Sequence, residues 1–126
     1  MDDVRVLVVV EDDADMRMLV RIMFDADPRL EVVGEATTAN EAVEVARSND
    51  PGLIILDHFI EGDVMGLEAA PMLKEAAPHA KIILFTSHEL SVEAAREPAI
   101  DAYLSKSNLH MLLPTAQQLV GLEPAT

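Results

Sequence analysis

Polar residues that can do chemistry follow apolar, strand-length segments at several places in the chain. In open α/β sheets, ligands bind beyond the carboxyl ends of the strands, so such side chains are expected to converge at one edge of a sheet. The residues in question are Glu11, Asp12 and Asp13 after the first segment, and then Asp57, Thr86 and Lys106 after later ones.

Clustered carboxylates repel one another and raise each other's pKa unless a cation neutralises them. Magnesium fits, because it prefers octahedral oxygen coordination and typically uses one or two carboxylates, waters and substrate phosphate oxygens. We predict Asp12 and Asp57 as direct ligands of Mg²⁺ and Glu11 as a ligand through a water molecule.

A carboxylate is also a nucleophile toward phosphorus when a metal and fixed cationic or hydroxyl groups stabilise the transferring group. Asp57 is the predicted nucleophile, with Lys106 and Thr86 supplying the charge and the hydroxyl. Taken singly, these residues could be a loop cap, a surface charge and a strand-end hydroxyl. Their joint placement after strands favours the phosphoryl-transfer interpretation.

Apolar segments alternate with amphipathic ones along the whole chain, which predicts an α/β fold with a parallel sheet and helices on both faces. In the helix of residues 14–25, Met16, Leu19, Val20 and Met23 lie at helical spacing and are the predicted core residues. Pro71 and Pro114 should each lie in a first turn or bend their helix. The predicted strands are 4–10, 30–34, 53–56, 81–85 and 102–104, and the predicted helices are 14–25, 40–48, 66–77, 91–97 and one from about 108.

The length of 126 residues fits a single domain over residues 1–126, with a short tail from about 121. No apolar segment suits a membrane span or a signal peptide, so a soluble, cytoplasmic protein is expected. The chain has no cysteine, which excludes disulfides and thiolate chemistry. Its formal charge of −14 disfavours direct binding to nucleic acid or to an anionic membrane.

Four motifs together resemble those of the receiver domains of bacterial response regulators, and the resemblance covers essentially the whole chain. It implies a flavodoxin-like, doubly wound, five-stranded parallel sheet of order 2-1-3-4-5 with five helices. The motifs are Val8–Asp13 followed by Arg17, Leu56-Asp57, Leu84–Ser87 and Asp101–Lys106.

The resemblance implies a phosphorylation-dependent switch of a two-component system. Asp57 would accept a phosphoryl group, with Mg²⁺, from the phosphohistidine of a sensor histidine kinase or from a phosphotransfer protein. Phe59 would offer its backbone carbonyl to the metal. Thr86 would move toward the phosphoryl group and free space for Tyr103, although Tyr103 could equally be half-buried filler. Such a domain promotes its own phosphotransfer and autodephosphorylation and is not an enzyme.

Output would pass through the surface of the fourth helix, fifth strand and fifth helix to a downstream protein target. Met18 and Ile22 form a second apolar stripe on the helix of residues 14–25, which either widens the core face or docks a helical partner such as the kinase. His58 and His88 flank the key positions, but imidazole suits softer metals, so neither is a predicted ligand.

The chain also departs from the family it resembles. Glu61 stands where most receivers have proline, and the segment to Gly66 is one residue longer, so an altered loop is expected after Asp57. Ser107 replaces a common proline after Lys106, so no cis peptide is expected there. The bulky ring of Phe59 should limit attack by water and give a long-lived phosphoryl group.

Three hypotheses about the biological role stay open. The first is a stand-alone receiver, monomeric or forming a phosphorylation-linked dimer, that signals to a protein partner. The second is the receiver half of a DNA-binding transcriptional regulator, because residues 34–36 and 40–42 are similar to receivers that precede helix-turn-helix domains. The third is a small phosphatase, which would need a second acid where Phe59 stands.

Overall fold

Five parallel strands form one sheet of order β2-β1-β3-β4-β5 in the computed structural model, which describes residues 4–9 and 11–124. The predicted strand order is therefore confirmed. The strands are β1 Val4–Val9, β2 Leu30–Ala36, β3 Leu53–Leu56, β4 Lys81–Thr86 and β5 Ala102–Ser105. The helices are α1 Ala14–Asp25, α2 Ala39–Asn49, α3 Gly66–Ala76, α4 Ser91–Arg96, the 3₁₀ helix η1 Lys106–Met111 and α5 Leu112–Leu119.

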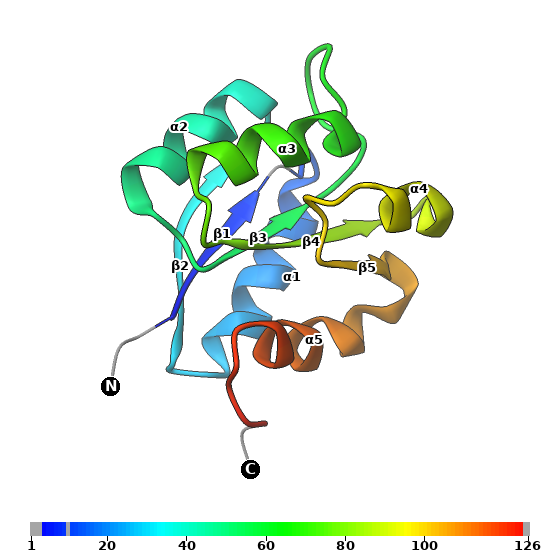
Figure 1. The fold of residues 1–126 in the computed structure, drawn as a ribbon. Coiled ribbons are helices and arrows are strands. Elements are labelled where there is room, and N and C mark those ends of the chain that lie inside the picture. Colours follow the sequence, from blue (N-terminus) through cyan, green and yellow to red (C-terminus); the bar gives the residue numbers. More distant parts are fainter. Residues whose placement is uncertain (1–3, 10, 125–126) are drawn as a thin grey trace.

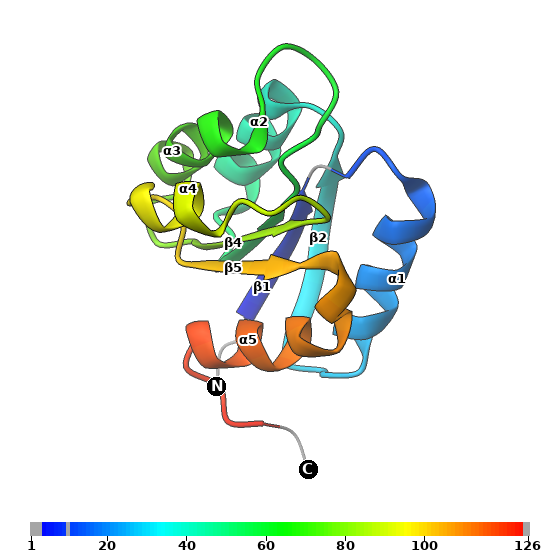
Figure 2. The same ribbon diagram turned by 90° about the vertical axis from the view of Figure 1, so that its right-hand side faces the viewer.

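Helices cover both faces of the sheet, with α2, α3 and α4 on one side and α1 and α5 on the other (Figure 1, Figure 2). Along β3, Ile54 and Leu56 join the core under α2 and α3, whereas Leu53 and Ile55 join the core above α1 and α5. This follows from the two-residue period of a strand. Burial on both faces explains why the segment is continuously apolar.

Helix α1 buries Val20 and Phe24, which lie four residues apart on one face. The prediction that Leu19 belongs to the core is wrong, because its side chain is 47% exposed. Met16 and Met23, predicted with it, are half-buried against the core. The ring of Phe24 takes the central place, and the buried line of the helix therefore runs through residues 20 and 24.

The last helix begins later than predicted. Residues Lys106–Met111 form a 3₁₀ helix with non-helical backbone angles at Asn108, and the α-helix starts at Leu112. Pro114 therefore lies in a first turn, where its missing N–H removes no helix hydrogen bond. Pro71, in contrast, lies inside α3.

A buried polar network ties the α1–β2 turn to α5. Asp27 is 1% exposed. Its carboxylate accepts two side-chain hydrogen bonds from Arg29, at 3.0 and 2.8 Å, and one from the Gln117 amide at 3.0 Å. Arg29 also donates to the Glu123 carbonyl at 2.7 Å. This network stabilises the end of the sheet opposite the carboxyl ends of the strands.

Throughout the described part of the chain, the helices are too short or too polar to cross a membrane.

Candidate functional site

The carboxyl ends of β1, β3, β4 and β5 meet at one edge of the sheet. The parallel register pairs Val9 of β1 with Leu56 of β3, and Leu56 with Leu84 of β4. Residues that follow these strands are therefore neighbours in space. This places Glu11, Asp57, Thr86 and Lys106 at the same edge, as the sequence predicts.

Lys106 is the centre of the charged cluster. Its Nζ lies 2.8 Å from Asp57 Oδ2 and also forms an ion pair with Glu11 Oε1. Glu11 and Asp57 are each only 6% exposed, so little water screens these charges. The Lys106–Ser107 peptide is not cis, as expected, since the described residues contain no cis bond.

The Asp57 carboxylate is held by donors on both of its oxygens. Oδ2 accepts from Lys106, and Oδ1 accepts from the backbone N–H of His58 at 2.7 Å. Asp57 ends β3 and begins the β3–α3 loop, so its orientation depends on a strand, a loop and η1. A carboxylate fixed in this way would lose little freedom on reacting as a nucleophile.

The charge balance of the cluster favours binding of a further cation. Burial raises the pKa of Glu11, the Lys106 hydrogen bond opposes this, and the nearby Asp57 charge raises it again, leaving the pKa above its ordinary value. Burial alone would lower the pKa of Lys106, but its hydrogen bonds to Asp57 and Glu11 raise it. Lys106 therefore remains an ammonium ion, and two carboxylates share its single charge.

The oxygen donors of this edge fit a hard divalent cation. In the described ranges, no three His, Cys, Asp or Glu side chains come together as a group that could hold a metal. Magnesium requires only one or two carboxylates beside waters, and Glu11 and Asp57 supply two buried ones. Asp12 is exposed to solvent, and its assignment as a direct ligand stays a prediction. Asp13 instead caps α1, with its carboxylate accepting from Asp15 N at 2.9 Å.

The two predicted switch residues meet at His88. Thr86 is fully buried at the end of β4, and its Oγ1 accepts from the His88 N–H at 3.4 Å. Half-buried Tyr103 donates its hydroxyl to the His88 carbonyl at 2.8 Å and accepts from Leu90 N at 3.5 Å. The backbone of His88 in the β4–α4 segment is thus hydrogen-bonded to both Thr86 and Tyr103.

Three aromatic rings lie together beside the charged cluster. Phe59, which is 44% exposed, stands 4.2 Å from His88 and 4.8 Å from His58 between ring centroids. Burial lowers the pKa of His58 despite the Asp57 charge. The sequence interpretation missed this cluster. The sequence did contain a signal. Phe59 comes two residues after Asp57, and His88 comes two residues after Thr86, at the ends of neighbouring parallel strands.

The loop between β3 and α3 projects beyond the helix layer (Figure 1). The Glu61 N–H donates to the Thr37 carbonyl at 3.0 Å, and Glu61 forms an isolated parallel bridge with Thr38. Gly62 follows with a φ of 95°, which glycine adopts without strain. The residue that replaces proline therefore ties the long loop to the β2–α2 connection.

Helix α1 presents an apolar face to solvent. Met18 and Ile22 are 63% and 60% exposed, and Leu19 adds to them. The alternative that this stripe widens the core is therefore wrong. Beside it, Arg17 donates to the Glu11 carbonyl, and its Nε pairs with a neighbouring carboxylate, Glu35, at 3.1 Å.

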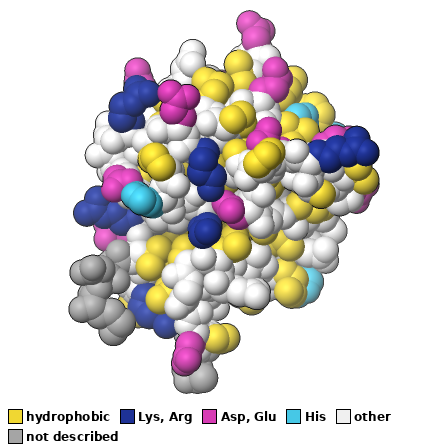
Figure 3. Space-filling view, in the orientation of Figure 1, with side chains coloured by type: hydrophobic (Ala, Val, Ile, Leu, Met, Phe, Trp, Pro, Cys, Tyr) yellow, Lys and Arg dark blue, Asp and Glu magenta, His cyan; other side chains and the backbone are white. Residues whose placement is uncertain are grey.

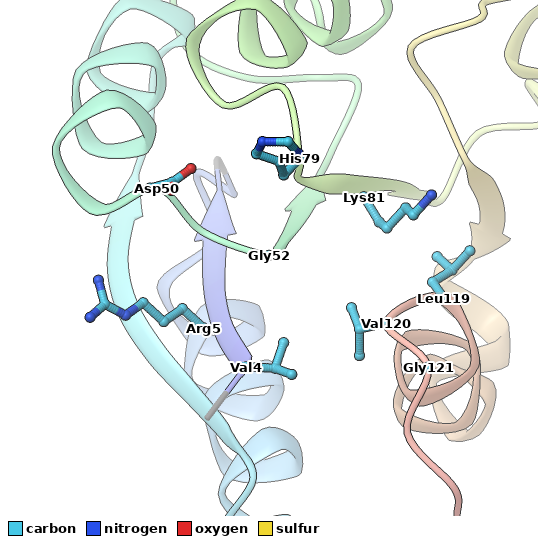
Figure 4. A pocket seen from close by; sticks show the side chains of 9 residues that line it. All are labelled: Val4, Arg5, Asp50, Gly52, His79, Lys81, Leu119, Val120 and Gly121. Atoms are coloured by element: carbon cyan, nitrogen blue, oxygen red, sulfur yellow. The ribbon is translucent and has the colours of Figure 1, made fainter. Parts of the chain in front are cut away.

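A cavity lies at the opposite end of the strands, between their amino ends and the end of α5 (Figure 4). Its volume is about 800 Å³. The side chains of Arg5 and Lys81 point away from each other there (Figure 4). On the face that Figure 3 shows, acidic and basic side chains are interspersed. The charged cluster of Glu11, Asp57 and Lys106 lies instead at the carboxyl ends of the strands.

Comparison with known proteins identifies the family. A model of the response regulator receiver domain matches residues 7–116. The chain is 33% identical over 102 residues to the nitrate/nitrite response regulator protein NarL of Escherichia coli (strain K12). The matched region covers 79% of this chain and 47% of NarL. The chain thus spans about half the length of that relative.

Solved structures agree with this match. A two-component response regulator of the LuxR family from Aurantimonas sp. SI85-9A1 is 26% identical, with a TM-score of 0.81, over 97% of this chain and 89% of its own. Response regulator protein TrrA from Thermotoga maritima, solved in complex with Mg(2+)-BeF, is 30% identical, with a TM-score of 0.79, over 92% and 98%. The chain belongs to the response regulator receiver domain family.

Proposed function

We propose that this receiver domain is a phosphorylation-dependent switch that accepts a phosphoryl group on Asp57 from the phosphohistidine of a sensor histidine kinase or phosphotransfer protein. The observation that carries the proposal is the bridge of Lys106 between the two buried carboxylates, Asp57 and Glu11. Such a domain is a regulatory phosphoacceptor that promotes its own phosphorylation and dephosphorylation.

Glu11, Asp12, Asp57 and the Phe59 carbonyl would hold Mg²⁺. Bound there, the metal supplies positive charge that offsets the carboxylates and the transferring phosphoryl oxygens. Two buried carboxylates that share one ammonium support this assignment. The complex of the relative TrrA with Mg(2+)-BeF supports it as well.

In the transfer step, an Asp57 carboxylate oxygen attacks phosphorus. The phosphorus–oxygen bond forms as the donor's phosphorus–nitrogen bond breaks, and the electron pair of that bond remains on the imidazole. Lys106 keeps its positive charge throughout and turns from the carboxylate toward the phosphoryl oxygens. Its raised pKa fits this role, because an ammonium must persist at neutral pH.

The output step runs through His88. Thr86 Oγ1 would exchange its hydrogen bond with the His88 N–H for one to a phosphoryl oxygen and draw the β4–α4 segment inward. Tyr103 would then lose its hydrogen bond to the His88 carbonyl and change rotamer. The surface of α4, β5 and α5 changes for a downstream protein, as a shift between two populations.

The exposed face of Met18, Leu19 and Ile22 on α1 is the proposed docking surface for the donor protein, whose helices would cover it.

A second candidate role is that of the receiver half of a DNA-binding regulator. It is favoured by the likeness to a LuxR-family response regulator and by the share of NarL that the chain covers. With a charge of −14, this domain itself is not expected to contact DNA.

The proposal is tested by incubating the protein with acetyl phosphate, with Mg²⁺ or with excess EDTA, and measuring its intact mass. One added phosphoryl group in Mg²⁺ and none in EDTA is the expected result. Equal modification in both would overturn the metal-assisted mechanism, and no modification under any condition would count against the phosphoacceptor assignment.

A further inference from the structure

Helix α3 begins without a side-chain cap of the usual kind. Met65 occupies the N-cap position, and within the described residues its side chain makes no capping hydrogen bond. Ser, Thr, Asp and Asn are favoured at this position because their oxygen accepts from the first turn. The first N–H groups of a helix have no partner within the helix and must be satisfied from elsewhere.

His58 satisfies two of these groups from the other end of the loop. Its carbonyl oxygen accepts from Gly66 N at 2.8 Å, and its imidazole Nδ1 accepts from Leu67 N at 3.3 Å. Its own N–H donates to Asp57 Oδ1 at 2.7 Å. One residue therefore binds the start of α3 and the phosphoacceptor carboxylate at the same time.

Gly66 shows how closely the start of α3 approaches Asp57. A Cβ at position 66 would lie 2.3 Å from the Asp57 carbonyl oxygen and 2.7 Å from His58 Cα. Only glycine fits such an approach. Because the two backbones are in contact, a shift of the first turn of α3 is transmitted directly to the residue that carries the carboxylate.

We propose that His58 is a positioning residue for phosphoryl transfer, which caps α3 through its imidazole and carbonyl and so fixes the backbone that orients Asp57. The inference rests on the proposed function of Asp57. Its specific content is that the imidazole acts as a hydrogen-bond acceptor for the helix and has no direct part in the chemistry.

Two substitutions separate the acceptor from the ring. His58→Leu removes the acceptor, whereas His58→Asn places an amide oxygen near the position of Nδ1. The rate constant of phosphorylation by acetyl phosphate is expected to fall roughly tenfold in H58L, because small misplacements of a reacting group are costly. H58N should stay close to wild type. In H58L, the Leu67 amide should also exchange faster with solvent.

A second-site change tests whether capping is the function. Met65→Ser supplies an N-cap hydroxyl, so the double variant of H58L with M65S should recover most of the phosphorylation rate. His79→Leu, an exposed histidine at the other end of the strands, serves as the control and should match wild type. Circular dichroism establishes that each variant is folded.

Two results would overturn the inference: H58L as fast as wild type, or H58L slow while H58N and the double variant are equally slow. The first removes any role for the imidazole, and the second assigns it a role other than capping. Absence of modification in the wild-type protein would instead count against the proposed function, so the two failures are distinguishable.

Discussion

Tyr103 donates its hydroxyl to the backbone carbonyl of His88 at 2.8 Å, while Thr86 accepts a hydrogen bond from the N–H of that same residue. The β4–α4 connection is thus held between Thr86, at the carboxyl end of β4, and Tyr103 of β5. The Tyr103 hydroxyl is therefore hydrogen-bonded, and in the proposed output step these hydrogen bonds would be the starting state.

Tyr103→Phe should loosen this connection without affecting the phosphoacceptor. Because a neutral hydrogen bond contributes about 1 kcal/mol net, the free energy of unfolding is expected to fall by about that amount. Acetyl phosphate should still modify Asp57 at the wild-type rate, while amide exchange at residues 88–90 accelerates before phosphorylation. Wild-type exchange at these amides in Y103F would contradict the assignment.

Lys106→Met should leave Glu11 and Asp57 facing each other with no compensating charge. Breaking a buried ion pair costs about 3–5 kcal/mol, and the partial exposure of this one reduces the expected loss to about 1–3 kcal/mol at pH 7. Because the pKa of Glu11 is raised in the fold, this cost appears as pH rises through that pKa and is absent below the unfolded value.

Urea unfolding at pH 7 and at pH 4 measures the difference in free energy of unfolding between K106M and wild type. This difference should be smaller at pH 4. A gap that is constant across that range would exclude the carboxylate pair as its cause. K106M should also lose most of its phosphorylation rate, since the proposed stabilisation of the transferring group is removed.

Asp27→Asn should destabilise the fold without changing the charged cluster of Glu11, Asp57 and Lys106. Hydrogen bonds from Arg29 hold the pKa of Asp27 far below its usual range despite its burial. An acid with a lowered pKa contributes stability that is fully present above the unfolded pKa, about 3.9, and is lost as pH falls below it. We expect D27N to cost about 2–3 kcal/mol at pH 7 and less at pH 3.

Asp25→Asn is the matched control, since Asp25 is exposed two residues earlier and should give no comparable change in urea midpoint. Equal stability of D27N and D25N at pH 7 would show that the Asp27 network contributes little. The phosphorylation rate of D27N should equal that of wild type.

Phe59→Asn should shorten the lifetime of the phosphorylated form. The ring packs against His88 beside Asp57, and its removal opens that side to water. The rate of phosphate release, measured after removal of the donor, is expected to increase roughly tenfold, which is equivalent to a barrier lower by about 1.4 kcal/mol. Val92→Asn, at an exposed apolar position on α4, should leave the lifetime unchanged. Equal lifetimes in F59N and wild type would refute the role of the ring.

The sequence predicts the sheet well because its central strands are buried on both faces. Leu53–Leu56 is continuously apolar for that reason, and the polar residues that follow such strands mark the functional edge. The strand order came from family resemblance, because apolar spacing does not specify which strands are neighbours. Leu19 was misplaced since two adjacent stripes of α1 are apolar, and only packing of the Phe24 ring selects between them.

Loop contacts are the part that spacing does not predict. The 3₁₀ helix before Leu112, the hydrogen bond of Glu61 to Thr37 and the capping of α3 by His58 all depend on the backbone path between elements. A side chain's type indicates that it can accept or donate. Its partner is decided by turns whose geometry is a product of the whole fold.

The most direct test of the central claim is to map the modified residue. The protein is incubated with Mg²⁺ and acetyl phosphate, trapped and analysed by peptide mass spectrometry, with Asp57→Ala and Asp13→Asn treated in parallel. The account predicts a single phosphoryl group on Asp57, retained in D13N and abolished in D57A. Modification that survives in D57A, or that maps to another residue of the wild-type chain, would contradict it.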